Sequence, residues 1–344
     1  MKIFILALLL PIQMLFGRLL ADDNSSSQVI GWGMNDGGQS TGVPSATRLD
    51  TNEVRVQGQI LRNCIAIAAG RWQGLALKSD GTVGAWGLNY NGEATGTPCG
   101  GWTNGIVAIG GRILSNVLSV SAGTTYSLAL LTNRMVVGWG GNLFQQLRIP
   151  AGLSNVVAIS AGKGHSLALR MDGTVVGWPD SLATPRLRSL SNIVAIAATS
   201  IEWGNDVALR ADGTVVQWNA QNGQEYEMQG LTNVIAIAAG GRDGHGVALN
   251  QDGTVADLLV DSSKATDHLG LSNVVSIAAG GSQGLALKKD GTIAAWAGLS
   301  SSHASVPRGL TNVVAIAAGE DFCLAIQTNR AGPITNTWPS LPRR

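Results

Sequence analysis

The stretch from Asn273 to Gly298, NVVSIAAGGSQGLALKKDGTIAAWAG, contains three short apolar segments separated by two turns. Val274 to Ala279 is β-branched and small, and a glycine-rich bend follows it. Leu285 to Lys288 and Ile293 to Trp296 then flank the dipeptide Asp290-Gly291. Asp-Gly between two apolar segments favours a hairpin with a type I′ turn, which has positive φ at both central residues. The stretch therefore predicts three short antiparallel strands.

The same pattern recurs along the chain. Its opening asparagines are Asn63, Asn116, Asn155, Asn192, Asn233, Asn273 and Asn312, separated by 53, 39, 37, 41, 40 and 39 residues. The Asp-Gly pair returns as Asp80-Gly81, Asp172-Gly173, Asp212-Gly213 and Asp252-Gly253, and Asn133-Arg134 takes its place in the second unit. A period of 20–50 residues is typical of solenoids, propellers and other repeat arrays.

A tryptophan closes the third segment of most units. These residues are Trp32, Trp86, Trp139, Trp178, Trp218 and Trp296, and Leu258 holds the position in the fifth unit. A large ring that recurs once per unit is typical of packing between sheets rather than of a binding site. The many alanines of the first segments suit strands that crowd around an axis.

The two ends of the chain complement each other. The last unit, from Asn312, lacks a clear third strand, and Gln28 to Gly33 is a third strand without a unit. We therefore predict an all-β fold, a seven-bladed β-propeller over residues 22–332, whose ring the N-terminal strand 28–33 closes by completing the last blade. Ile334 to Trp338 is the competing closing strand, but the prolines beside it make it a poor inner strand.

Two phrases carry a family resemblance: VVAISAGKGHSLALRMDGTVVGWP (156–179) and VVSIAAGGSQGLALKKDGTIAAW (274–296). They resemble regulator of chromosome condensation repeats, which form seven-bladed β-propellers, and the resemblance covers about residues 28 to 330. The later, compact units resemble secreted bacterial members more than the founding eukaryotic one. Some of these inhibit β-lactamases through an aromatic-rich face, and the loop WGMNDGGQSTGVP (32–44) is similar to their loops. The histidine of the family's Gly-x-x-His-Ser bend is His165 here, but the matching positions are Gln73, Tyr126, Gln283 and Phe322, which indicates a structural role.

The repeats are of two kinds. TNEVRVQGQILRN (51–63) matches TNGIVAIGGRILSN (103–116), and both precede the common phrase. We expect these inserts to add an outer strand or a longer loop to adjacent blades. The bends of the fourth and fifth units are also lengthened, at 199–206 and 240–246, and these insertions are candidate specificity elements.

The first 21 residues, MKIFILALLLPIQMLFGRLLA, differ from the repeats. Lys2 precedes an apolar run from Ile3 to Phe16, and Ala21 is a small residue at a possible cleavage site. This arrangement is typical of a secretory signal peptide. A membrane anchor is the alternative, although Arg18 interrupts the run before about 20 residues are reached. We expect an exported bacterial protein, secreted or in the cell envelope, with no membrane span after cleavage and a proline-rich tail at 333–344.

The composition limits the class of partner. Of 344 residues, 45% are hydrophobic and 13% are charged, which indicates a folded chain rather than a disordered one. Removing the signal peptide leaves 21 basic and 22 acidic residues, a net charge of −1. Nucleic-acid-binding proteins usually carry a basic surplus or stripe, so we expect no nucleic-acid partner.

Neither the cysteines nor the histidines show the spacing of a reactive site. Cys64, Cys99 and Cys323 lack metal-ligand spacing. Cys64 and Cys323 lie in apolar segments, so buried free thiols are favoured over a disulfide. The four histidines have no partner at triad or metal-ligand spacing, and no G-x-S-x-G, H-E-x-x-H or P-loop occurs. We expect no enzyme activity and no cofactor or metal, although a propeller can assemble a site from distant blades.

The strand order places two sets of loops on one face: the bends after the first strands and the loops after the tryptophans. The predicted protein-binding residues of this face are Arg71, Trp72, Tyr90, Tyr126, Phe144, His165, Trp203, Arg242, His245 and Phe322. Trp, Tyr and Arg are enriched at binding hot spots, and loops on a rigid scaffold commonly carry function. The alternative is that these rings only cover the tops of the blades.

The function expected from the sequence is an exported, non-enzymatic, monomeric propeller that binds another protein through this loop face. Inhibition of an enzyme such as a β-lactamase is an alternative. Nucleotide exchange on a small GTPase, as in the founding family member, is a second alternative. A hydrolase or lyase that uses the central pocket is the third.

Overall fold

The computed structural model describes residues 27–45, 50–179, 187, 190–199, 205–219, 225–231, 233–240, 246–258, 265–267, 270–281, 283–297 and 305–329. The predicted signal peptide, the tail 333–344 and the competing strand 334–338 lie outside these residues. So do Trp203, Arg242 and His245. Within the described part of the chain, no helix is long and apolar enough to cross a membrane.

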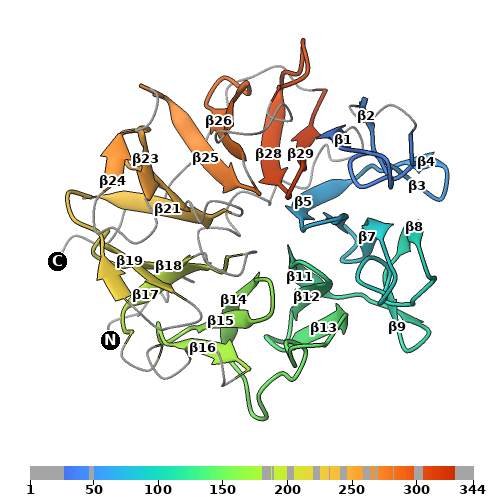
Figure 1. The fold of residues 1–344 in the computed structure, drawn as a ribbon, viewed down its shortest axis with the longest axis horizontal. Helices are drawn as coiled ribbons and strands as arrows, with labels where there is room; N and C mark the ends of the chain where they lie inside the picture. The colour runs from blue at the N-terminus through green and yellow to red at the C-terminus, as the bar shows by residue number, and fades with distance from the viewer. Residues whose placement is uncertain are drawn as a thin grey trace, which may run out of the picture.

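The described chain is built from small antiparallel sheets that stand around a common axis like the blades of a propeller (Figure 1). Among the described residues, seven sheets have three or four strands, and two further pairs of strands form hairpins. The first sheet combines strands from the beginning and the end of the described chain. Its order is β2 (Asp50–Glu53), β1 (Gln28–Gly33), β29 (Phe322–Gln327) and β28 (Val313–Ala318). The second contains β5 (Cys64–Ala69), β6 (Gln73–Lys78), β7 (Val83–Leu88) and β8 (Trp102–Ile106).

Three sheets have three strands each. They are β11 (Val117–Ala122), β12 (Tyr126–Leu131) and β13 (Val136–Gly140); β14 (Val156–Ala161), β15 (Ser166–Arg170) and β16 (Val175–Trp178); and β25 (Val274–Ala279), β26 (Gln283–Lys288) and β27 (Ile293–Ala297). Two more have four: β17 (Ile193–Ala197), β18 (Asn205–Arg210), β19 (Val215–Asn219) and β20 (Glu225–Glu227); and β21 (Val234–Ala239), β22 (Gly246–Asn250), β23 (Val255–Leu258) and β24 (Ala265–Asp267).

The N-terminal strand β1 pairs antiparallel with β29, from Gln28 opposite Gln327 to Gly33 opposite Phe322. The strand therefore has the bounds predicted from sequence. At the same junction the Glu320 N–H donates to the Gly70 carbonyl oxygen, 3.3 Å away, across to the sheet of β5.

The opening asparagines share one backbone conformation. All seven have positive φ, between 56° and 60°. Asparagine tolerates this left-handed region better than other residues with a side chain, because its short amide can bond locally. Each first strand then contains a register shift, such as that between Val156 and Ala158 opposite β15. The repeated asparagine is therefore explained by the backbone rather than by chemistry of its side chain.

The Asp-Gly hairpins form as predicted, but the prediction that their turns are of type I′ was wrong. Around Asp172 only Gly173 has positive φ, at 80°. The Gly173 N–H donates to the Arg170 oxygen and the Arg170 N–H to the Thr174 oxygen, which describes a three-residue loop with a left-handed glycine. The Asp172 Oδ1 accepts hydrogen bonds from the N–H and hydroxyl of Thr174, at 3.0 and 2.6 Å. This bonding is satisfied with the aspartate in an ordinary conformation, so the turn does not need a second residue with positive φ.

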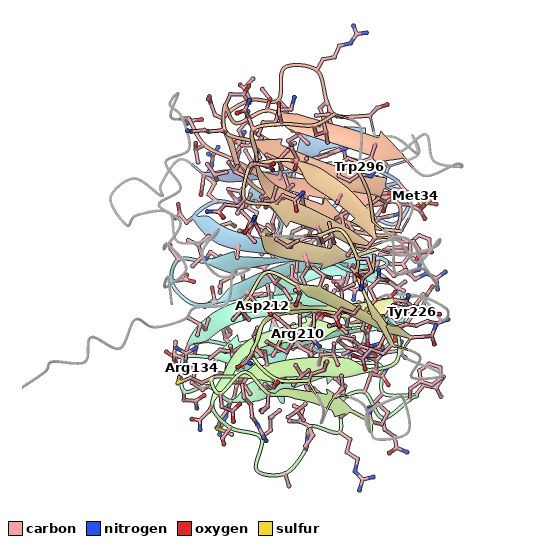
Figure 2. The ribbon with its side chains drawn as sticks, turned by 90° about the vertical axis from the view of Figure 1, so that its left-hand side faces the viewer. Met34, Arg134, Arg210, Asp212, Tyr226 and Trp296 are labelled. Atoms are coloured by element: carbon pink, nitrogen blue, oxygen red, sulfur yellow. The ribbon has the colours of Figure 1, made fainter. Side chains whose placement is uncertain are left out.

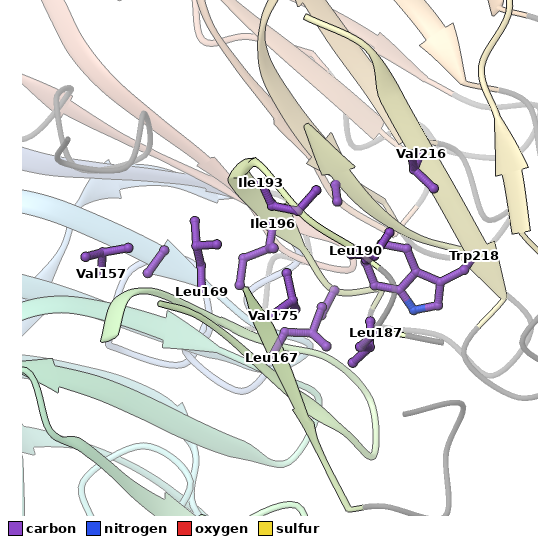
Figure 3. Packing of buried hydrophobic residues seen from close by; sticks show 13 residues of the cluster. Val157, Leu167, Leu169, Val175, Leu187, Leu190, Ile193, Ile196, Val216 and Trp218 are labelled. Carbon is purple, nitrogen blue, oxygen red and sulfur yellow. The ribbon is translucent and has the colours of Figure 1, made fainter. Parts of the chain in front are cut away.

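The core lies between neighbouring sheets, and the tryptophans pack there as predicted. Trp32, Trp86, Trp139, Trp178 and Trp218 are all buried, and so is Leu258. Figure 3 shows one interface, where Trp218 and Ile196 of one sheet meet Leu167 and Leu169 of its neighbour. Cys64 and Cys323 are buried free thiols, also as predicted, and burial raises the pKa of each to about 12.

The two related inserts add both an outer strand and a hairpin. β2 pairs with β1, and β8 pairs with β7. The hairpins are β3 (Arg55–Val56) with β4 (Gln59–Ile60), and β9 (Ala108–Ile109) with β10 (Arg112–Ile113). The insert prediction is confirmed, and the sequence missed the outer strands β20 and β24 of two later sheets.

Candidate protein-binding face

The two faces of the disc carry different loops. Figure 2 shows Met34, which follows β1, and Arg134, in the turn between β12 and β13, at opposite sides of the molecule. We call the side with Met34 the top face; it carries the bends after the first strands and the loops after the third strands. The side with Arg134 is the bottom face, which carries the Asp-Gly turns.

The bends of the top face are joined to one another by backbone hydrogen bonds. The Arg71 N–H donates to the Gly123 oxygen, the Thr124 N–H to Gly162, and the Lys163 N–H to Thr199, at 3.1–3.3 Å. Each of these three bends is thus hydrogen-bonded to the bend of the next sheet. This network fixes the loops near the axis before any partner binds.

The positions equivalent to His165 reinforce this network from within. Gln73 donates to the Gly123 oxygen at 2.9 Å, and Gln283 donates to the Gly319 oxygen at 3.1 Å. The Tyr126 hydroxyl donates to the His165 carbonyl oxygen at 2.6 Å and accepts from the Gly162 N–H at 3.1 Å. Side chains of different types therefore all bond to the bend of the next sheet.

Three of the predicted contact residues are consequently misassigned as partner-facing surface. Tyr126 and Phe322 are completely buried, and His165 is 6% exposed. Their side chains point into the junctions between sheets, where the bends need filling and hydrogen bonding. Burial of Tyr126 raises the pKa of its hydroxyl, so it acts as a neutral donor. These residues support the top face and offer no side-chain surface to a partner.

His165 forms a buried pair with Asp206 across the boundary between two sheets. Its Nε2 lies 2.9 Å from Oδ2 and 3.0 Å from Oδ1 of Asp206. Burial lowers the pKa of His165, but the carboxylate raises it, and the net direction is upward. Asp206 also accepts the Thr199 N–H at 2.8 Å, so the pair fixes the bend of the next sheet.

Arg71, Trp72 and Trp102 form an aromatic cluster at the top of the sheet that contains β5 and β8. The Trp72 and Trp102 rings meet edge to face, with centroids 6.3 Å apart. The Arg71 guanidinium carbon lies 5.5 Å from the Trp72 ring centroid, and its Nε is 2.9 Å from Oε2 of Glu320. The two rings are half-buried, so they combine a fixed geometry with accessible area. Such rigid aromatic and arginine side chains are typical of binding hot spots.

Trp102 was missed from the sequence because it lies outside the once-per-unit tryptophan pattern. It begins β8, the outer strand supplied by the insert. Its ring lies directly over Gly37 of a neighbouring loop, where any side chain would collide with it. The available signal was its place at the start of the insert, close to the top end of an added strand.

Tyr90 and Phe144 lie on two related loops, 89–101 and 141–153, and are 56% and 47% exposed. Leu143, which the sequence analysis did not select, is 86% exposed beside Phe144. The Asn89 Oδ1 accepts the N–H groups of Ala94 and Thr95, both at 3.0 Å, and holds its loop in one shape. The exposed apolar side chains therefore project from a preorganised backbone.

These loops also lock neighbouring sheets together. The Trp86 indole donates to the Gln39 oxygen at 2.9 Å and Trp178 to the Gln146 oxygen at 2.7 Å. Trp139 donates to the Ala94 oxygen at 3.0 Å. The loop after one sheet is thus bonded to the tryptophan of the next, which links the top-face loops to the core.

A cavity of about 290 Å³ lies on the axis, lined by the first strands. Its described lining is mainly alanine and isoleucine, with serines and one ionisable residue, Glu320. The Ser121 and Ser160 hydroxyls already accept the backbone N–H groups of Ala161 and Ala198. Among the described residues, no group of three or more His, Cys, Asp or Glu could hold a metal ion. The described lining offers no cluster of acids or histidines for hydrolysis.

No protein-family model matches the sequence, and no curated protein matches it. Solved structures do. Human WBSCR16 has a TM-score of 0.70 and 18% identity, over 88% of this chain and 100% of that one. Prp20p from Saccharomyces cerevisiae has a TM-score of 0.69 and 17% identity, over 89% and 92%. Yeast RCC1 (Prp20) in its complex with Kap60 has a TM-score of 0.68 and 18% identity, over 88% and 89%.

At these identities the likeness concerns the fold. It covers most of the chain and agrees with the small antiparallel sheets and their arrangement around one axis. The resemblance found in the repeats is therefore confirmed at the level of structure: the chain has the β-propeller fold of the regulator of chromosome condensation proteins.

Proposed function

We propose that this protein is an exported, non-enzymatic propeller that binds another protein through its top face. The observation that carries the proposal is the set of accessible aromatic side chains on a bonded scaffold: the Arg71–Trp72–Trp102 cluster, Tyr90 and Phe144. Preorganisation lowers the entropic cost of association, which makes such a face suited to tight binding. Among the related folds, Prp20p is described with its binding to Gsp1p and histones, and yeast RCC1 with bound Kap60.

We also propose seven blades in a closed ring. The seven sheets of three or four strands among the described residues support this, as do the pairing of β1 with β29 and the hydrogen bond from Glu320 to Gly70. A closed ring leaves no exposed face of a terminal sheet. It would also fix the top-face loops of all blades relative to one another.

A capture experiment with matched variants tests the binding proposal. Residues 22–344 would be immobilised beside W72A/Y90A/F144A, which removes top-face rings, and M135A/M171A, which removes the exposed methionines Met135 and Met171 of the bottom-face turns. Extracts of secreted and envelope proteins would be passed over each. We expect a partner held by the native chain and by the bottom-face variant, and lost by the top-face variant. Equal capture by all three would place the site elsewhere.

Inhibition of an enzyme is a narrower form of the proposal. If the captured partner is an enzyme, its turnover should fall in proportion to occupancy by the native protein and not with W72A/Y90A/F144A. Export has its own test, because a mature N-terminus at Asp22, read by mass spectrometry of the secreted protein, is the expected result. Retention of residues 1–21 in a cytoplasmic protein would contradict it.

A further inference from the structure

Among the described residues, the outer edge of β13 has no partner strand, and residues 50–179 around it are described without a gap. β13 pairs with β12 on its inner side only. The Gly141 N–H donates inward to the Thr125 oxygen at 2.8 Å, so alternation along the strand turns the backbone groups of Val136, Gly138 and Gly140 outward. No backbone hydrogen bond joins these groups to residues 141–155. Leu147, Ile149 and Leu153 pack against the cluster that contains Val136, but they supply no partner strand. A strand edge without a partner is a template for another strand.

Sheets with an outer strand differ from the sheet of β13 in the burial of their third strand. In β7, β19 and β23 an outer strand is present, and the middle residues of the third strand are all buried. In β13, Val137 and Gly138 are only half-buried. Gly140 is half-buried as well, whereas Gly87 at the matching position of β7 is buried, as expected where no outer strand covers the third strand.

Among the described residues, the hairpin β9–β10 has no outer strand of the next sheet to contact. In the preceding repeat, the hairpin β3–β4 contacts β7 and β8. There the Asn104 Oδ1 accepts the Gln57 N–H at 2.6 Å, and its Nδ2 donates to the Gly42 oxygen at 2.7 Å. The Asn104 amide of the outer strand thus connects two repeats.

In the next repeat the equivalent groups are available. Gly110 corresponds to Gln57 and Gly96 to Gly42, since Ala108 and Arg55 make the same bonds to the preceding loops, at 2.9 Å. The Gly110 N–H and the Gly96 oxygen have no hydrogen-bond partner among the described residues. Ile113, at the position of half-buried Ile60, is 64% exposed.

We propose that the rim edge, formed by the outer edge of β13 and the hairpin β9–β10, binds an extended segment of a partner protein as an added antiparallel strand. The outer strand β8 supplies the pattern, WTNGI at residues 102–106. The segment carries an asparagine that accepts from the Gly110 N–H and donates to the Gly96 oxygen. It also carries an apolar side chain that covers Ile113. Main-chain pairing gives the affinity and these two contacts give the selectivity. This surface is on the rim, so it is independent of the top-face proposal.

The probe is the synthetic peptide GWTNGIV, the sequence of residues 101–107, titrated into the full mature chain. Amide resonances of the protein are followed by NMR. We expect saturable shifts at Val136, Gly138, Gly140 and Gly110. The peptide with alanine in place of its asparagine should bind about tenfold more weakly, because two hydrogen bonds are lost.

Matched protein variants distinguish peptide binding at the rim edge from non-specific binding. I113K places a charge at the rim edge on an exposed residue and should abolish the shifts without changing the fold. M171K places the same charge on Met171, an exposed residue of the bottom face, and should bind the peptide like the native chain. Absence of shifts at the four amides at saturating peptide, or shifts that I113K leaves intact, would overturn the proposal. A concentration-dependent dimer that I113K dissociates would also overturn it, because a second copy would then occupy the rim edge.

Discussion

Glu93 occupies the position that Gln39 and Gln146 hold in the two related loops. Each of these side chains accepts a backbone N–H within its loop, and Glu93 accepts that of Asn91 at 2.7 Å. The other carboxylate oxygen of Glu93 is buried and has no hydrogen-bond partner among the described residues. Burial raises the pKa of Glu93. The raised pKa means that the ionised form destabilises the folded loop.

We therefore predict that E93Q stabilises the protein at neutral pH by about 1 kcal/mol, because it removes a buried charge and keeps the hydrogen bond. A carboxyl group with a raised folded-state pKa contributes stability below its unfolded pKa and loses it as pH rises through the folded pKa. The advantage of E93Q should therefore shrink on acidification. Urea unfolding at acidic and neutral pH measures both effects. Q146E, the reverse change in the related loop, should be destabilising at neutral pH and less so in acid.

The pair of His165 and Asp206 predicts a second pH dependence. The folded-state pKa of His165 is raised by the carboxylate, so the pair contributes fully below the unfolded pKa and is lost as pH rises through the folded pKa. H165Q should unfold with less change across this range, because glutamine performs the same task at Gln73 and Gln283. D206A should lose about 3 kcal/mol, as expected when one partner of a buried pair is removed. Equal pH dependence of native protein and H165Q would contradict this assignment.

At the scale of the element, the turns between second and third strands differ at one position. Arg134 has φ of 69° where the other turns have glycine, such as Gly173 at 80°. A side chain in the left-handed region costs roughly 1–2 kcal/mol. R134G should therefore raise the free energy of unfolding by about 1 kcal/mol, and G173A should lower it by a similar amount. Chemical denaturation of both variants measures this, and stabilisation by G173A would show that strain does not govern the turn.

The strands were predictable because their signals are local. Apolar segments bounded by turns defined β25 and β27 to within one residue, and the bounds of β1 agreed completely. The turn type was not predictable from Asp-Gly alone, because the choice depends on hydrogen bonds that Thr174 makes after the turn. The outer strands β20 and β24 have only three residues and are set by pairing with a formed sheet.

At the scale of the whole molecule, the candidate site was the least predictable part. Exposure of a ring in a bend depends on the neighbouring sheet, which sequence spacing does not describe. Tyr126 and Tyr90 are both tyrosines of top-face segments, yet one is completely buried and the other is 56% exposed. The Tyr126 hydroxyl bonds to the bend of the next sheet, whereas Tyr90 lies on a loop whose Asn89 side chain bonds to the backbone of the same loop. The repeat therefore locates the face but does not identify its accessible residues.

The junction of the chain's two ends determines whether the top face stays rigid, and a cross-link can test this. Gln28 lies opposite Gln327, 299 positions along the chain, and their side-chain amides are 3.3 Å apart. In a background with C99S, the pair Q28C/Q327C should form a disulfide, because directly paired strand residues have suitable separation. By the chain-entropy relation, restricting the unfolded chain over so long a loop should stabilise the folded protein by about 5–6 kcal/mol.

Thermal unfolding with and without reductant measures this difference, and the reduced protein is its own control. If oxidation raises the melting temperature and leaves partner capture by the top face unchanged, β1 closes the native ring as proposed. If the cysteines do not cross-link while the protein is folded, β1 is not held beside β29 in solution. Cross-linking without stabilisation would mean that the two ends already associate in the unfolded chain.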